Sequence, residues 1–167
     1  MNTLAWTPEL SLNHALLDNT HEEFVDLLNR VGQALDDGAD ALPPFKALLA
    51  HTEEHFAMEA RWMQQCGFDD ANCHTRQHDM VLNIMREVVR YAEELNDREP
   101  LSIARTELAV WFANHASSMD AGLVHSMTEL GFDPVTGQCK VSRAEASPEL
   151  APCHTPQSAC STSVNPA

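Results

Sequence analysis

The sequence predicts an all-α protein, an antiparallel up-down-up-down four-helix bundle with a disordered C-terminal tail. Apolar residues recur at steps of three and four, which is the spacing that lines one face of an α-helix, and strand-like alternation is absent. Proline and glycine divide the chain into long intervals that suit helices. Of the 167 residues, 44% are hydrophobic and 21% charged, so we expect one compact domain with its own core.

Four apolar stripes mark the expected helices in order. They cover residues 14–35, 45–63, 74–92 and 104–119. Each stripe predicts an amphipathic helix of about 20 to 26 residues, with one seam turned toward a common core. Prolines stand where these helices can begin and glycines where they can end, namely at Pro43, Pro44 and Pro100 and at Gly38, Gly67 and Gly131.

The composition changes after Pro134. The last 33 residues contain four Pro, five Ser and three Cys and no aromatic residue, so this segment cannot bury enough apolar surface to fold alone. We therefore expect the bundle to occupy residues 1–134 and a flexible tail to occupy residues 135–167.

The charge balance excludes several classes of partner. Asp and Glu number 25 against 10 Lys and Arg, so the formal charge is −15, which repels nucleic acid and anionic lipid. No apolar run of about 18 residues is available for membrane insertion, and the first twelve residues lack the basic start of a signal peptide. These features predict a cytoplasmic protein.

Ionisable residues interrupt the apolar seams of all four helices. A buried imidazole without a hydrogen bond costs on the order of 1–3 kcal/mol and a lone carboxylate costs more, so a partner must compensate them. Histidines that pair with acids or backbone carbonyls are the favoured interpretation for any single position, but ligand-type residues on every seam favour a metal site. The residues concerned are His21, His55, Glu59, His74, His78, His115 and Asp120.

The spacing of these residues suits convergence on metal ions. Two pairs stand four residues apart, namely His55 with Glu59 and His74 with His78. Such pairs share one helix face. His115 and Asp120 are five residues apart, about 140° on a regular helix, so they either reach two metal positions or lie on a local irregularity. Five imidazoles and two carboxylates exceed one tetrahedral zinc and suit two metals, with iron favoured by the mixed nitrogen and oxygen ligands.

These motifs resemble the hemerythrin family, in particular the single-domain bacterial hemerythrins, over residues 4–125. The family pattern is a Trp near the start, an isolated His after Leu-Asp, His-Phe with Glu four residues after the His, His-x3-His, and Trp-x3-His-x4-Asp. The matching residues here are Trp6, Leu17-Asp18 with His21, His55-Phe56 with Glu59, His74 with His78, and Trp111 with His115 and Asp120.

The resemblance implies a non-haem centre of two Fe ions joined by an oxo or hydroxo bridge. One iron would be held by His74, His78 and His115 and the other by His21 and His55. Glu59 and Asp120 would bridge the two irons, and O2 would bind reversibly at the iron with two histidines. The expected function is oxygen storage, delivery to an O2-consuming enzyme, or sensing, by a monomer that is not itself an enzyme.

The expected O2 pocket departs from the common bacterial pattern. It would contain Trp111, Phe112 and Ala116, and the last two stand where relatives usually have Leu and Ile. One side is therefore bulkier and the other smaller, which bears on O2 affinity and autoxidation. An enzyme that reduces peroxide or nitric oxide is the first alternative function.

A redox or oxygen-sensing module that acts through the tail is the second alternative. The tail carries Cys139, Cys153 and Cys160, which could chelate a soft metal or form a regulatory disulfide. Cys66 and Cys73 flank the expected connection between the second and third helices, where we interpret them as small residues rather than a redox pair. His14 is interpreted as a helix-end residue that makes a capping bond.

Overall fold

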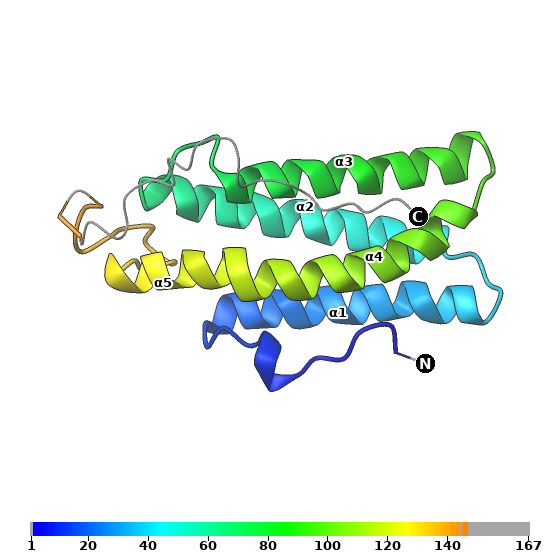
Figure 1. The fold of residues 1–167 in the computed structure, drawn as a ribbon, viewed down its shortest axis with the longest axis horizontal. Helices are drawn as coiled ribbons and strands as arrows, with labels where there is room; N and C mark the ends of the chain where they lie inside the picture. The colour runs from blue at the N-terminus through cyan, green and yellow to red at the C-terminus, as the bar shows by residue number, and fades with distance from the viewer. Residues whose placement is uncertain (1, 144, 147–167) are drawn as a thin grey trace, which may run out of the picture.

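The computed structural model describes residues 2–143, 145 and 146. Within them the chain forms α1 (Ala15–Asp36), α2 (Leu42–Gln65), α3 (Cys73–Glu94), α4 (Glu99–His115) and α5 (Ala121–Glu129), after a short 3-10 helix at Pro8–Leu10. A π-helical turn, Ala116–Asp120, joins α4 to α5, and the two helices continue along one line in Figure 1. Helix α1 packs on α2, α2 on α3, α3 on α4 and α4 on α1, so the predicted all-α four-helix bundle is confirmed.

The helices begin and end where proline, glycine and capping side chains predict. Prolines lie in the first turns of α2 and α4, where the missing N–H has no helical partner to lose. Gly38 and Gly67 follow the ends of α1 and α2 with positive φ, a backbone conformation that glycine adopts without strain. His14 caps α1 by accepting a hydrogen bond from Leu17 N–H at Nδ1, which confirms its predicted role.

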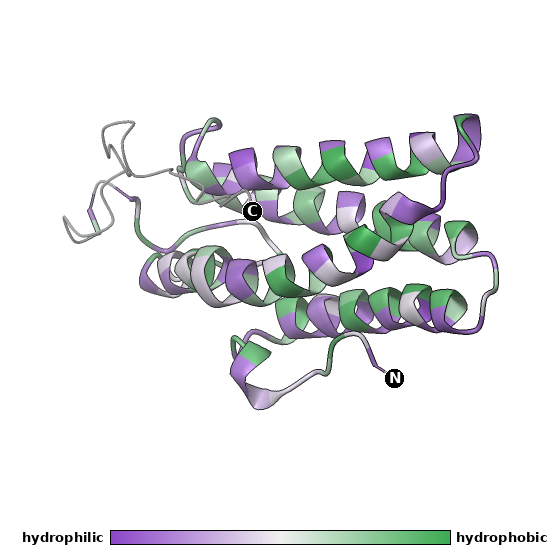
Figure 2. Ribbon diagram, turned by 45° about the vertical axis from the view of Figure 1, so that its right-hand side comes forward, coloured by the Kyte–Doolittle hydropathy of each residue, from purple (hydrophilic) through white to green (hydrophobic). Residues whose placement is uncertain are grey.

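Two apolar clusters occupy the two ends of the bundle interior, which we call the apolar half and the metal half. In Figure 2 hydrophobic and hydrophilic residues alternate along each helix, as amphipathic packing requires. The apolar half includes Leu28, Val31, Phe45, Leu48, Met85 and Leu101. The metal half includes Leu17, Trp62, Met63, Cys66, Leu123 and Leu130. The ionisable residues of the seams lie between these clusters.

The segment after α5 folds back onto the end of the bundle. Lys140 N–H donates to the carbonyl of Leu130, and Asp133 forms an isolated β-bridge with Gln138. The Arg143 guanidinium lies over the ring of Phe68, 4.1 Å from its centroid. The bundle contacts thus extend past the expected boundary at residue 134, because a loop can dock through backbone hydrogen bonds that composition does not reveal. Most of the tail expected at residues 135–167 lies outside the described residues, namely residue 144 and residues 147–167.

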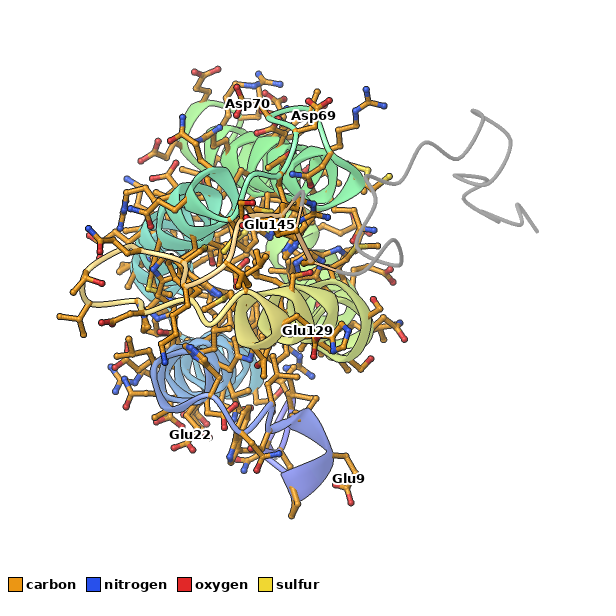
Figure 3. All side chains as sticks on the ribbon, turned by 90° about the vertical axis from the view of Figure 1, so that its left-hand side faces the viewer. Glu9, Glu22, Asp69, Asp70, Glu129 and Glu145 are labelled. Carbon is orange, nitrogen blue, oxygen red and sulfur yellow. The ribbon has the colours of Figure 1, made fainter. Side chains whose placement is uncertain are left out.

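Exposed acids surround the metal half of the molecule. Figure 3 views the bundle from this end, where the labelled acids point outward; they are Glu9, Glu22, Asp69, Asp70, Glu129 and Glu145. Among the described residues, no helix has both the length and the apolar character needed to cross a bilayer.

Candidate metal centre

Each of the four long helices, α1 to α4, contributes side chains to one buried cluster. The histidines and acids predicted from the seams are all buried, with relative exposures from 0% to 6%. They form two groups that share Glu59, and within each group the possible ligand atoms lie within 4.8 Å of one another. The first group is Glu59, His74, His78, His115 and Asp120, and the second is His21, His55 and Glu59.

Three imidazoles converge in the first group. His78 Nε2 lies 2.9 Å from His115 Nε2, which lies 3.1 Å from His74 Nε2. Each nitrogen-to-nitrogen contact accommodates at most one proton, so at least one lone pair in each contact is directed at another nitrogen. A cation placed among the three Nε2 atoms would use all three lone pairs.

Two imidazoles face the carboxylates in the second group. His55 Nε2 lies 2.9 Å from Glu59 Oε1, and His21 Nε2 lies 3.2 Å from Asp120 Oδ2. The rings of His21 and His55 are 5.1 Å apart between centroids. This side of the cluster therefore offers two nitrogens where the other side offers three.

Each carboxylate reaches both groups, with one oxygen on each side. Glu59 Oε1 faces His55, while its Oε2 lies 3.2 Å from His74 Nε2 and 3.3 Å from His78 Nε2. Asp120 Oδ2 faces His21, while its Oδ1 lies 3.0 Å from His74 Nε2 and 3.2 Å from His115 Nε2. This division of oxygens is the arrangement that two bridging carboxylates require.

The π-helical turn brings Asp120 to the same side as His115. In this turn the Ala121 N–H donates to the carbonyl of Ala116, five residues earlier. Residues five apart are thereby aligned, whereas a regular α-helix would separate them by about 140°. Of the two possibilities left open by the spacing, the local irregularity is the one observed.

Charge compensation within the cluster is uneven. Burial and the neighbouring Asp120 raise the pKa of Glu59, but the hydrogen bond with His55 and the close contact with His74 outweigh them, so its pKa is lowered. Burial opposes protonation of His74, yet Asp120 and Glu59 raise its pKa to about 9. Burial lowers the pKa of His78 to about 3 despite Glu59. Without a cation, the two carboxylates are thus balanced by protons on only some of the imidazoles.

Several polar atoms of the cluster have no well-directed hydrogen bond, and their chemistry shows whether a metal would fit. Within the described residues, these buried atoms are both ring nitrogens of His21, both oxygens of Asp120 and Oε2 of Glu59. The carboxylate oxygens lie 3.0–3.3 Å from imidazole nitrogens, close enough for charge attraction but poorly aligned for hydrogen bonds. Unpaired buried polar atoms are costly, and these are nitrogen and oxygen donors suited to iron. The cluster therefore fits a metal centre.

Aromatic rings separate the cluster from solvent. Phe56 stacks on His78 with centroids 3.7 Å apart, and Trp111 stacks on His115 at 4.4 Å. Phe112 meets His21 edge-on at 5.2 Å. Among the predicted O2-pocket residues, Phe112 thus lies at the two-histidine group and Trp111 at the three-histidine group. The third, Ala116, is fully buried.

Sequence reasoning missed one partner of a histidine. His115 Nδ1 lies 2.9 Å from Gln77 Oε1, so its N–H donates to the amide oxygen and leaves Nε2 to face the cluster. The available signal was the place of Gln77 immediately before His78, one turn after His74. Gln77 was overlooked because its partner comes from another helix, 38 residues away.

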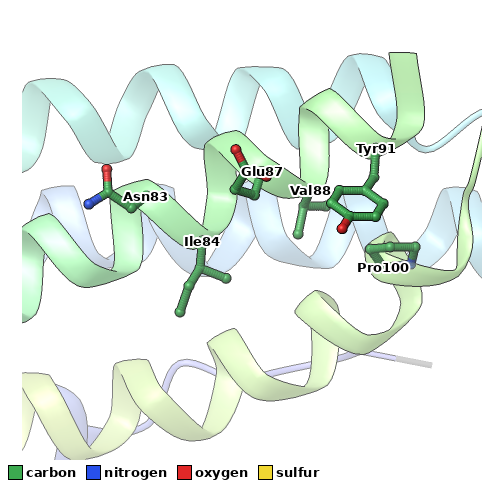
Figure 4. A pocket seen from close by; sticks show the side chains of 6 residues that line it. All are labelled: Asn83, Ile84, Glu87, Val88, Tyr91 and Pro100. Carbon is green, nitrogen blue, oxygen red and sulfur yellow. The ribbon is translucent and has the colours of Figure 1, made fainter. Parts of the chain in front are cut away.

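A surface hollow on the bundle lacks the converging histidines and carboxylates of the buried cluster. It lies on the outer side of α3 near the start of α4, and Figure 4 shows Ile84, Val88, Tyr91 and Pro100 in its lining. Because the lining is mainly apolar, the hollow presents no set of groups that could hold an ion.

Known proteins are similar to this chain in sequence. Residues 13–125 match the family model described as the hemerythrin HHE cation binding domain. A bacteriohemerythrin of Ralstonia nicotianae is 37% identical over 136 residues, which cover 80% of this chain and 95% of that protein. Bacteriohemerythrins of Pseudomonas aeruginosa (28% identical; 82% of this chain, 92% of the relative) and Stenotrophomonas maltophilia (26%; 72% and 78%) are also similar. No solved structure matches significantly.

Proposed function

We propose that this chain, which belongs to the hemerythrin family, binds O2 reversibly at a centre of two iron ions. His74, His78 and His115 would hold one iron, His21 and His55 the other, and Glu59 and Asp120 would bridge them. When bound, the iron pair would supply the electrons that make O2 binding reversible without a porphyrin.

The division of each carboxylate between the two histidine groups carries this proposal. Glu59 and Asp120 each direct one oxygen toward the pair of histidines and the other toward the trio. A single ion would leave one of the two histidine groups without a metal. Two ions use both groups, and the two-histidine side keeps an open position for a small ligand.

The protein around the centre would hold water away from it. Phe112 covers His21 from one side, Phe56 and Trp111 cover the three-histidine group, and Ala116 is fully buried beside them. Exclusion of water disfavours the loss of reduced oxygen species, and that loss would leave the irons oxidised and inactive. A dry, enclosed site of this kind suits a ligand as small as O2.

Iron analysis and an oxygenation cycle test the proposal. The full chain loaded with ferrous iron should contain about two irons per chain. After anaerobic reduction, air should produce a long-lived coloured species that returns to the reduced spectrum under argon. Iron content near one per chain, or failure to regain the reduced spectrum, would contradict the proposal.

An enzyme that reduces peroxide or nitric oxide is the alternative function. It would consume many equivalents of substrate per chain with an electron donor, whereas a carrier would exchange O2 without consuming it. The predictions of a cytoplasmic monomer, and of O2 delivery to an O2-consuming enzyme, stay predictions.

A further inference from the structure

Two thiols that are distant in sequence meet at the end of the metal half. The sulfur of Cys139 lies 3.9 Å from the sulfur of Cys66 and 3.7 Å from the carbonyl of Gln65. Cys66 follows the last residue of α2 and is 2% exposed, while Cys139 is half-buried in the segment after α5. Both sulfurs are present as free thiols in this structure.

The loop that carries Cys139 has internal hydrogen bonds and packs against the end of α2 at Gln65. Asp133 N–H donates to the carbonyl of Gln138, and the carbonyl of Asp133 accepts from Gly137 N–H. Gly137 has φ +70°, which glycine adopts without strain, and its missing Cβ leaves room for the Gln65 side chain of α2. The sulfur contact is therefore part of a packed arrangement rather than a chance approach of a free chain end.

We propose that Cys66 and Cys139 form a reversible disulfide that joins the segment after α5 to the end of α2. The sulfurs, 3.9 Å apart, must approach to about 2.05 Å for the bond to form, which requires a change of side-chain torsion at one or both residues. The bond would close a loop that contains α3, α4 and α5. This inference is independent of O2 binding, because neither sulfur belongs to the metal cluster.

Hydrogen peroxide is the oxidant class that fits the site. Burial, followed by the proximity of Cys139, raises the pKa of Cys66 to about 12, so Cys66 stays protonated. The more accessible Cys139 therefore reacts first: its thiolate attacks a peroxide oxygen, the O–O bond breaks, and the hydroxide that leaves takes up a proton to become water. Cys139 is then a sulfenic acid.

The second half of the reaction uses the buried thiol. Cys66 Sγ attacks the sulfur of the Cys139 sulfenic acid, the S–O bond breaks, and the departing hydroxide takes the Cys66 proton to form a second water. The two thiols lose two electrons in total, and one peroxide is reduced to two waters. A dithiol reductant would reverse the bond.

Thiol counting and peptide mapping of the full chain test the proposal. Stoichiometric hydrogen peroxide should lower the five free thiols to three, and mapping after alkylation should find the Cys66 and Cys139 peptides linked. Dithiothreitol should restore all five. Linkage of Cys139 to Cys153 or Cys160, or full alkylation of Cys66 after peroxide, would overturn the proposal.

Matched variants separate this disulfide from general thiol oxidation. Cys139→Ser should abolish the linked species, while Cys73→Ser, which changes a half-buried cysteine at the start of α3, should keep it. Since Cys139 is only half-buried, its variant should melt near the wild-type temperature in reducing buffer. Oxidation should raise the melting temperature of wild type and of Cys73→Ser but not of Cys139→Ser; an equal rise in all three would contradict the assignment.

Discussion

The two halves of the bundle are stabilised in different ways. The apolar half is filled by leucine, valine, phenylalanine and methionine side chains, which gain free energy simply by leaving water. Beside the metal half lie five imidazoles and two carboxylates that are nearly inaccessible to solvent. These groups lose hydration on burial, and several find no hydrogen bond among the described residues.

Folding and metal binding depend largely on different residues of the same helices, although Phe56 and Phe112 of the apolar cluster also contact the histidines. Helix α2 contributes Phe45 and Leu48 to the apolar half and His55 and Glu59 to the cluster, two to four turns further along. We expect burial of the apolar half to establish the bundle without metal, so that the bundle then holds the ligands at the required separation. Changes in the two halves should therefore affect different measurements.

The largest expected effect is loss of metal on removal of a bridging carboxylate. Asp120→Ala and Glu59→Ala each remove oxygens directed at both histidine groups, so iron content should fall from about two to well below one per chain. Glu54→Ala is the control, because Glu54 is an exposed acid on α2, the helix that also carries Glu59. Retention of two irons by either cluster variant, measured by elemental analysis, would argue against a bridging role.

A change in the apolar half should lower the stability of the fold and leave the iron content unchanged. Leu101 is 1% exposed and lies 14 residues before His115, about 21 Å away along the axis of α4. Leu101→Ala should lower the free energy of unfolding by about 2–5 kcal/mol, measured with denaturant, because it leaves a cavity. The iron content of the folded variant should stay at wild-type level; a loss of iron would mean that the halves are coupled.

The metal-free protein should have a stability maximum near pH 6.5. The pKa of His74 is raised to about 9 in the folded protein, so its stabilising contribution is complete below pH 6.5 and lost as the pH rises toward 9. The pKa of His78 is lowered to about 3, so protonation opposes folding as the pH falls below 6.5. Thermal melts at several pH values test this.

Metal loading should change that profile. A cation at the cluster takes the place of the His74 proton, so the loss of stability between pH 6.5 and pH 9 should largely disappear in the loaded protein. Equal pH profiles for the loaded and the metal-free protein would contradict the assigned role of His74.

A smaller effect is expected at Gln77. Gln77→Ala removes the acceptor of His115 Nδ1–H, so the imidazole loses its fixed orientation, and metal affinity should fall about 10- to 100-fold in a chelator competition. Gln77→Glu keeps an acceptor oxygen and should retain most of the affinity. If both variants bound iron as wild type does, the hydrogen bond would have no part in positioning His115.

The smallest expected effect is at Phe112. Phe112→Leu removes the ring edge beside His21 and opens space there, so water should enter and the oxygenated form should oxidise several-fold faster. Phe24→Leu is the matched control, because Phe24 stacks on Phe112 at 4.5 Å. The autoxidation rate is measured as the loss of the oxygenated spectrum over time. Equal rates in both variants would show that general loosening of the core, and not the Phe112 ring beside His21, controls autoxidation.

Much of the site could be predicted because its information is local. The pairs His55 with Glu59 and His74 with His78 need only the period of a helix to place them on one face, and His14 needs only its position before a helix to cap it. The spacing of His115 and Asp120 was ambiguous. A π-helical turn is disfavoured on its own, so the sequence pattern of one helix could not select it.

The sequence by itself determined the four helices, their buried faces and the residues that meet in the cluster, because helical periodicity and the cost of burying polar groups act on short stretches of chain. Only the tertiary structure decided how each carboxylate divides its oxygens, that Gln77 orients His115 and that Cys139 meets Cys66. These contacts join residues on different elements, up to 73 positions apart for the two thiols. Their geometry depends on how whole helices and loops pack, which no local pattern encodes.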